Sequence, residues 1–265
     1  MNVLYWDASS LFTSVMRQRT FALTPTRKRI LITLKSGPAS SSYDISTLRR
    51  HEGAGSIIPM SITGRFAILI DGGFVRWKLQ KKHSHFPTAQ ELCAECDRIK
   101  AHDRLKELSL LRIYFYDAAP ASGTLTNPID GSVIDLATTS IHTQCTSLHQ
   151  AIELLPDFAL RQGVAAVHGW TFGEKAMESL ATRPRVPVAK DLVPNIEQKG
   201  VDLRIGLDIA RLSLQRLVDV IVVVTGDSDL VPAFKFARRE GTRIYLDYMG
   251  HGVRRELKVH ADIVL

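Results

Sequence analysis

Short apolar runs alternate along this chain with stretches of helical periodicity, and this alternation restricts the fold more than any other feature. The runs Phe66–Ile70, Leu111–Tyr116 and Asp219–Val224 have the length of strands and are too short for helices. They lack the strict apolar–polar alternation of strands that have one solvent-exposed face, so we expect these strands to be buried on both faces. The sequence therefore predicts a three-layer α/β/α fold with a mostly parallel central sheet.

The remaining elements follow from periodicity and from breaker residues. Helices are expected from residue 72 to Lys82, from Pro87 onward, over about 145–162, from Val201 onward and up to Glu240. Gly241 fits the position just after a helix end. Further strands are predicted over Val164–Phe172 and Thr242–Tyr248. The segment from 117 to about 142 is rich in Gly, Pro, Ser and Thr and is predicted as a loop.

Residues 1–60 differ in composition from the rest of the chain. The first 59 residues hold eight Lys or Arg against three Asp or Glu and so carry +5 of the net charge of +7. They show no sustained period, which predicts a poorly ordered N-terminal extension or a start codon assigned too early; a transit peptide has the same composition. We expect one domain over residues 64–265. Its near-neutral charge is weak support for a nucleic-acid partner.

The chain offers no sign of a membrane or secreted protein. No apolar run approaches the roughly 20 residues that span a bilayer, and the first residues lack the pattern of a secretory signal. Three cysteines in 265 residues argue against a disulfide scaffold. A reducing cytoplasm is the expected location.

Aspartates follow two of the apolar runs at the point where each run ends. One segment is Ile70-Asp71-Gly72-Gly73, and the other is Val224-Thr225-Gly226-Asp227-Ser228-Asp229. In open parallel sheets, ligands bind outside the carboxyl ends of the strands. A single aspartate there is usually a turn or cap residue, and Asp229 is expected to cap the following helix. Aspartates from two strand ends predict a shared acidic cleft.

A further acidic segment precedes the helix that starts near Val201. Asp202 and Asp208 lie six residues apart, so they do not share a helix face well, and we favour Asp202 as the one that faces the cleft. Carboxylates gathered in a cleft repel one another unless a cation neutralises them. Oxygen ligands suit Mg²⁺ or Mn²⁺, and such an ion can activate water and stabilise charge on a phosphate.

Three motifs together resemble those of NYN domains, also described as LabA-like or DUF88 and grouped with the PIN-like nucleases. The motifs are Ile70-Asp71-Gly72-Gly73, Lys199-Gly200-Val201-Asp202 and Gly226-Asp227-Ser228-Asp229-Leu230-Val231-Pro232. The resemblance covers about residues 64–250. It implies a PIN-like, Rossmannoid fold and a metal-dependent ribonuclease, and we expect single-stranded RNA as its partner.

The resemblance also implies roles for individual residues. Metal-binding and catalytic carboxylates would be Asp71, Asp202, Asp227 and Asp229, and Asp208 is a further candidate outside this set. Ser228 would orient phosphate, and Lys199 would contact the nucleic-acid backbone. Many family members carry Asn at the end of the first motif, where this chain has Phe74. Phe cannot bond to a metal-bound water, so it stacks on a base or packs against the sheet.

Other charged and cysteine groups were weighed for function. Lys78, Lys81 and Lys82 form a basic helix directly after Asp71; this is either a solvated face or a surface that holds RNA phosphates. Trp77 is either a stacking platform or core. Cys93 and Cys96 with His102 do not supply a zinc site of four ligands at fitting distance, and buried helix cysteines are favoured.

Three functions from different classes remain open at this stage. The leading one is a metal-dependent ribonuclease; the second is a non-catalytic RNA-binding or regulatory module that retains the fold, for which Phe74 is the main support. A phosphotransfer fold of another kind is weaker: a haloacid-dehalogenase site needs Asp-x-Asp after the first strand, and a Toprim site needs Glu where Asp71 stands. The sequence leaves open the RNA substrate, cleavage polarity, metal and oligomeric state, including a homo-oligomer.

Overall fold

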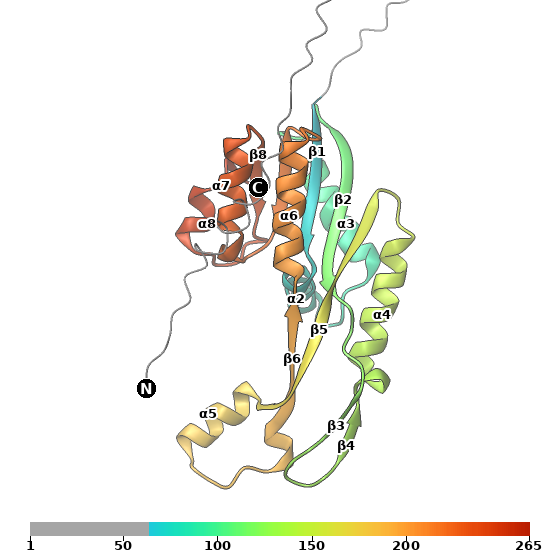
Figure 1. The fold of residues 1–265 in the computed structure, drawn as a ribbon, viewed down its shortest axis with the longest axis vertical. Coiled ribbons are helices and arrows are strands. Elements are labelled where there is room, and N and C mark those ends of the chain that lie inside the picture. Colours follow the sequence, from blue (N-terminus) through green and yellow to red (C-terminus); the bar gives the residue numbers. More distant parts are fainter. Residues whose placement is uncertain (1–63) are drawn as a thin grey trace, which may run out of the picture. The chain divides into compact units, whose positions relative to one another are not determined.

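A seven-stranded sheet forms the centre of the protein in a computed structural model, which describes residues 64–265 (Figure 1). Its strand order is β6-β5-β2-β1-β7-β8-β9. Neighbouring strands are parallel except for β6, which runs antiparallel to β5. The strands are β1 (Arg65–Asp71), β2 (Ser109–Ala118), β5 (Phe158–Phe172), β6 (Leu192–Lys199), β7 (Val220–Val224), β8 (Arg243–Asp247) and β9 (Ile263–Val264).

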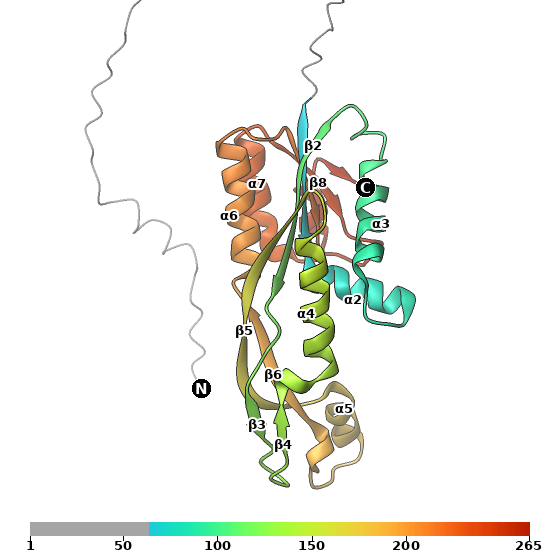
Figure 2. The ribbon, with the colours of Figure 1, turned by 90° about the vertical axis from the view of Figure 1, so that its right-hand side faces the viewer.

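Helices cover both faces of this sheet (Figure 2). One face carries α2 (Gly72–His83), α3 (Ala89–Lys100) and α4 (Ser140–Glu153). The other carries α6 (Val201–Leu214), α7 (Val231–Arg239) and α8 (Arg255–Val259). The predicted three-layer α/β fold is therefore confirmed. The expected extension, residues 1–60, lies outside the described residues.

The central strand β1 explains why its sequence shows no alternation. Ala67 and Leu69 point into the core beneath α6 and α7, whereas Phe66, Ile68 and Ile70 point into the core beneath α2 and α3. Successive strand residues face opposite sides, and here both sides are covered. A continuous apolar run is therefore the pattern that a strand in this position requires.

The segment between β2 and β6 differs from the prediction. The helix expected over about 145–162 is wrong at both ends, because α4 begins at Ser140, capped by Thr139, and ends at Glu153. The chain then enters β5, which starts at Phe158. Part of the expected loop forms a short antiparallel hairpin of β3 (Thr124–Thr126) and β4 (Val133–Asp135). Strands of three residues are too short to leave a readable period.

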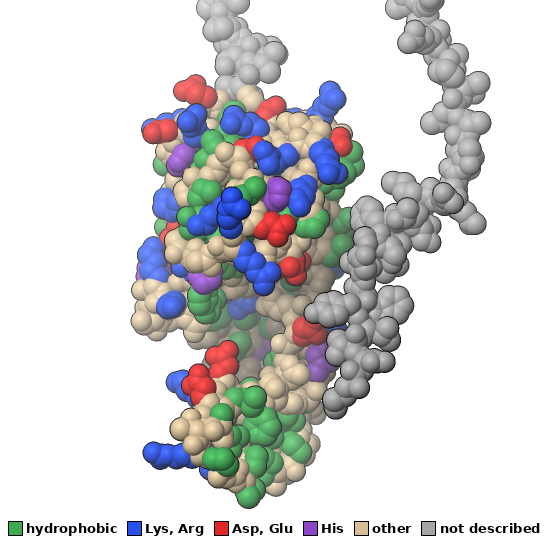
Figure 3. Space-filling view, turned by 90° about the vertical axis from the view of Figure 1, so that its left-hand side faces the viewer, with side chains coloured by type: hydrophobic (Ala, Val, Ile, Leu, Met, Phe, Trp, Pro, Cys, Tyr) green, Lys and Arg blue, Asp and Glu red, His purple; other side chains and the backbone are tan. Residues whose placement is uncertain are grey.

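Strands β5 and β6 continue past the rest of the sheet as a two-stranded arm that carries α5 (Glu174–Thr182), as Figure 1 shows. Residues 173–199 show no period from which an element could be predicted. Exposed apolar side chains gather on this arm, and Figure 3 shows green, hydrophobic side chains at the lower end of the view. They include Phe172, Met177, Val186, Val188 and Val193. Within residues 64–265, every helix is too short or too polar to span a bilayer.

Removal of one buried ring tests the packing of α7 on the sheet. Phe234 is fully buried in the core beneath α6 and α7, so Phe234→Ala should lower the free energy of unfolding by about 3–5 kcal/mol. Leu207→Ala is the control, because Leu207 is 60% exposed and should change stability by less than about 0.5 kcal/mol. Equal losses for both variants in urea unfolding would contradict this packing.

Candidate active site

Asp71 occupies the carboxyl end of the central strand and also caps α2. Its Oδ1 accepts a hydrogen bond from the Phe74 backbone N–H at 3.1 Å, and its Oδ2 accepts one from the Thr225 hydroxyl at 3.0 Å. The helix can begin directly after the strand because residue 72 is glycine. A β-carbon there would lie 2.5 Å from the Tyr116 carbonyl oxygen, closer than packing allows.

Thr225 links Asp71 to the turn that follows β7. Its side chain is buried, and while its hydroxyl donates to Asp71, its oxygen accepts the Asp227 backbone N–H at 3.0 Å. Strands β1 and β7 are parallel neighbours, with Ile70 paired to Val224. Their carboxyl ends therefore meet, and one hydroxyl fixes the distance between the two acidic segments.

The expected helix cap at Asp229 is wrong. Asp227 caps the one-turn 3-10 helix η3 (Ser228–Leu230), since its Oδ1 accepts the Asp229 backbone N–H at 2.9 Å. The following helix α7 has no side-chain cap and starts on Val231 and Pro232. This arrangement leaves the Asp229 carboxylate exposed to solvent and outside the backbone hydrogen bonds of the turn.

Asp202 approaches the same place from a third element. Gly200 adopts a left-handed backbone (φ 74°) that turns the chain from β6 into α6, and Asp202 lies in the first turn of that helix. Burial raises the pKa of the Asp71 carboxyl to about 6, and the charges of Asp202 and Asp227 add to this rise. Burial also raises the pKa of Asp202, as do Asp227 and Asp229. The four carboxylates thus lie close enough for their charges to affect one another's pKa values.

The aspartates do not form a compact set of three direct ligands for one ion. Among residues 64–265, no three of these carboxylates bring oxygens within 4.8 Å of one another. Ligands that directly bind one small octahedral ion lie within about 4 Å of each other. Mg²⁺ usually keeps several of its waters and takes one or two carboxylates directly. The donor set fits Mg²⁺ or Mn²⁺ held partly through water.

The structure separates Asp208 from this group. Its Oδ2 accepts a hydrogen bond from the Tyr116 hydroxyl at 2.8 Å and lies 3.4 Å from Arg161 Nε. Asp208 is thus neutralised within the fold, on the side of α6 that faces β2 and β5. Ser228 lies in η3 between Asp227 and Asp229 and is partly exposed.

Phe74 packs against the acidic turn. A β-carbon at Gly226 would lie 2.7 Å from the Phe74 ring, so the glycine lets the turn approach it. The Phe74 ring centroid lies 5.9 Å from that of His251, which in turn meets Trp77 edge-on at 5.1 Å. Phe74 is therefore part of the wall of the site.

Gln198 and a buried network behind the site did not emerge from the sequence reasoning. A β-carbon at Gly73 would lie 3.2 Å from Gln198 Oε1 and 3.5 Å from Asp71 Oδ1, so both side chains lie next to Gly73. Gln198 also donates to Asp117 at 3.2 Å. Asp117 directly follows the apolar run of β2, the same signal that marked Asp71.

Asp117 is fully buried and completely paired. Arg76 Nε lies 2.8 Å from its Oδ2, and His149 Nε2 lies 2.9 Å from the same oxygen. Burial alone raises the pKa of this carboxyl, but the His149 hydrogen bond and the Arg76 charge bring it below its ordinary value. The network joins β2, α2 and α4 behind Asp71 and holds α2 in place.

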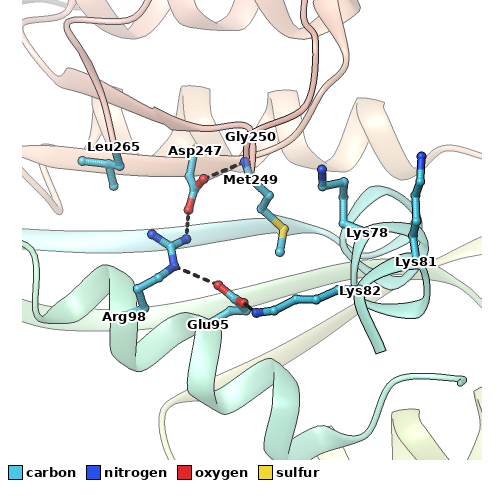
Figure 4. Close-up of a pocket in the computed structure, with 9 residues that line it drawn as sticks. All are labelled: Lys78, Lys81, Lys82, Glu95, Arg98, Asp247, Met249, Gly250 and Leu265. Carbon is cyan, nitrogen blue, oxygen red and sulfur yellow. Dashed lines mark hydrogen bonds and ion pairs between the residues drawn. The ribbon is translucent and has the colours of Figure 1, made fainter. Parts of the chain in front are cut away.

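The predicted basic residues divide between two places. Lys78, Lys81 and Lys82 line a surface cavity of about 500 Å³ between α2, α3 and the end of β8 (Figure 4). Figure 4 shows Lys82 turned toward Glu95, 2.9 Å away, whereas Lys78 and Lys81 extend away from it. Lys199 is exposed at the end of β6, 3.5 Å from Glu197.

Cys93 and Cys96 lie within α3. Burial raises the pKa of the Cys96 thiol to about 12, which keeps the free thiol protonated at neutral pH. Within the described part of the chain, neither these cysteines with His102 nor Cys145 with its neighbouring histidines forms a compact ligand group.

Residues 162–264 match the model of a known family, described as NYN domain. This is the family that the three motifs resemble. The matched range includes Asp202, Asp227 and Asp229, and Asp71 lies before it. NYN domains belong to the PIN-like nucleases, which supports a nuclease-type function in general. Such nucleases generally use divalent metals.

Comparison with curated proteins found no match. Among solved structures, one similar chain is a protein of unknown function from Vibrio parahaemolyticus. It is 14% identical with a TM-score of 0.43, and the alignment covers 77% of this chain and 92% of that one.

The raised pKa of Asp71 predicts a pH-dependent cost to stability. The folded protein holds this proton more tightly than the unfolded chain does, so stability should fall as the pH rises from about 4 to about 6. At pH 7.5 in EDTA, the free energy of unfolding of Asp71→Asn should therefore be about 1–3 kcal/mol higher than that of the wild type. Near pH 4 the two proteins should be equally stable. Glu107→Gln, on an exposed carboxylate, serves as control. A gain that is the same at both pH values would contradict this origin.

Proposed function

We propose that this protein is a metal-dependent ribonuclease that hydrolyses phosphodiester bonds at the Asp71–Asp227 cleft. The observation that carries the proposal is the Thr225 hydroxyl, which contacts the Asp71 carboxylate and the Asp227 backbone at 3.0 Å each. Four like charges near this point, one of them partly buried, are costly without a cation. A site that binds a cation offsets this cost when the cation is bound.

The aspartates divide the work by position. Asp71 and Asp227, at the carboxyl ends of β1 and β7, would bind Mg²⁺ or Mn²⁺ directly. Asp202 and Asp229, which are more exposed, would contact the ion through water. A bound ion of this kind supplies charge stabilisation at the phosphate and a more acidic water. Ser228 stands between Asp227 and Asp229, where its hydroxyl can donate to a phosphate oxygen.

The absence of asparagine at position 74 is offset by a neighbouring amide. Gln198 Oε1 lies next to Gly73, the second residue after Asp71, and its Nε2 donates to Asp117. An amide in this place can bond to water or substrate near the ion. Gln198 can therefore take the role that Phe74 cannot fill.

Single-stranded RNA is the proposed substrate because of the surface next to the cleft. Trp77 is 46% exposed, and the ammonium groups of Lys78 and Lys81 lie 5.9 and 5.4 Å from its ring. An exposed ring flanked by cations binds a stacked base and its phosphates. The His251 ring connects this surface to Phe74 and hence to the acidic turn.

A non-catalytic RNA-binding module is the second candidate, and Phe74 is the observation that favours it. That module would keep the basic surface and the metal site but would not turn over RNA. We further propose that residues 64–265 form one NYN/PIN-like domain. The outcome of the cleavage experiment decides between the two functions.

Loss of one aspartate should abolish cleavage. With the full chain, single-stranded RNA and Mn²⁺, Asp227→Asn should reduce the cleavage rate more than about 100-fold, because the ion supplies several kcal/mol to the transition state. Asp208→Asn is the matched control on α6 and should retain most activity. Cleavage by the wild type and Asp227→Asn at equal rates would contradict the site. RNA binding without any turnover would favour the second function.

Removal of two lysines should weaken RNA binding through phosphate contacts. Lys78→Gln with Lys81→Gln should lower affinity and reduce the slope of log affinity against log salt concentration by about 0.7 per lysine. The control changes Lys175 and Lys190 to Gln, two exposed lysines on the arm. An unchanged slope in fluorescence anisotropy would exclude this surface from the RNA path.

A further inference from the structure

Two histidines and a glutamate converge where α2 meets α3, away from the aspartate cleft. His83 is the last residue of α2, His85 follows after Ser84, and Glu91 lies in the first turn of α3. Ser84 adopts a left-handed backbone (φ 61°), and this reversal brings both imidazoles to the same side. Across residues 64–265, these three side chains form the one group of three ligand-type residues whose atoms lie within 4.8 Å of one another.

The distances within this group match a small tetrahedral ion. His85 Nε2 lies 3.2 Å and His83 Nδ1 lies 3.7 Å from the same Glu91 oxygen, Oε1. Ligands on a zinc ion at about 2.05 Å are separated by about 3.3 Å, the edge of a tetrahedron. Small rotations of exposed side chains would bring all three into that geometry.

A hydrogen bond on the far side of the His85 ring prepares it as a ligand. His85 Nδ1 lies 2.9 Å from the Phe86 carbonyl oxygen, so this nitrogen donates its proton there. In the neutral ring, Nε2 then carries a lone pair, and that lone pair faces a carboxylate. An imidazole nitrogen and a carboxylate oxygen 3.2 Å apart need a proton or a metal ion between them, and a metal ion can replace the proton. Histidines that bind metals usually donate their other ring N–H to a carbonyl or carboxylate in this way.

Glu91 is fixed from its other oxygen. The Oε2 atom accepts the Thr88 backbone N–H at 2.8 Å, and the Thr88 side chain in return caps the helix. This capping box holds the carboxylate in place and leaves Oε1 free to face the histidines. Two of the three ligands thus have the outer partners that orient metal ligands.

We propose that His83, His85 and Glu91 bind a zinc ion, with water as the fourth ligand. Imidazole and one carboxylate suit Zn²⁺, whereas the oxygen donors around Asp71 suit Mg²⁺ or Mn²⁺. The ion would clamp the end of α2 to the start of α3. Since α2 carries Lys78 and Lys81, the clamp would hold the helix that presents the basic surface. The site does not depend on the proposed nuclease activity.

Titration of the untagged, metal-free full chain tests this proposal. Calorimetry with Zn²⁺, and visible absorption with Co²⁺ as a tetrahedral probe, should show one ion per chain at this site. His85→Gln should weaken Zn²⁺ binding more than about 100-fold, because loss of an outer partner alone costs about 10–100-fold. Glu91→Gln should weaken it too, although glutamine at this position can still complete the capping box; urea unfolding would check that both variants fold.

Two controls separate this site from the alternatives. His168 lies 3.0 Å from Glu197 as an exposed histidine–glutamate pair, so His168→Gln should leave Zn²⁺ binding unchanged. Asp227→Asn should also leave it unchanged, because the aspartate cleft is a separate site. Absence of Zn²⁺ binding by the wild type, or unaltered binding by His85→Gln, would overturn the proposal. Equal loss in Asp227→Asn would assign the ion to the cleft instead.

Discussion

One buried hydroxyl organises the acidic end of this sheet. Thr225 directly follows β7 and contacts both Asp71, at the end of β1, and the backbone of Asp227. The contact exists because β1 and β7 are parallel neighbours whose carboxyl ends reach the same edge. Two aspartates that are 156 positions apart in the sequence are thereby held near each other, and an ion between them depends on that contact.

The burial of Asp71 in this arrangement destabilises the folded protein, and the surrounding structure compensates for that cost. Burial raises the pKa of Asp71 to about 6, which means that its ionised form is destabilised at neutral pH. The fold offsets this cost with a central strand buried on both faces and with the paired Asp117 network behind α2. Sites that bind ions commonly accept such destabilisation, because the ion restores the balance when it binds.

The sequence predicted the parts of the structure that depend on local pattern. Apolar runs located β1, β2 and β7, and their parallel pairing brought Asp71 and Asp227 to one edge. It predicted β5 only from Val164 to Phe172 and missed the hairpin of β3 and β4 and the strand β6, because three-residue strands and a half-exposed strand leave no clear period. Gln198 was missed because its proximity to Asp71 arises only from the pairing of β5 with β6.

The His83–Glu91 group shows the same limit at short range. His83 and His85 were visible in the sequence, but the left-handed turn at Ser84 that aligns them with Glu91 was not. Their distances from Glu91 Oε1 could be measured only in the folded chain. Local sequence therefore marks residues with suitable chemistry, and the fold decides which of them meet.

The central claim is that aspartates from three separate elements hold one divalent ion. A crystal structure of the full chain grown with Mn²⁺, with anomalous scattering recorded to locate the metal, tests it most directly. The account predicts an anomalous peak between Asp71 and Asp227, with Asp202 and Asp229 reached directly or through one water. A structure with no peak in this cleft at saturating Mn²⁺ would contradict the account.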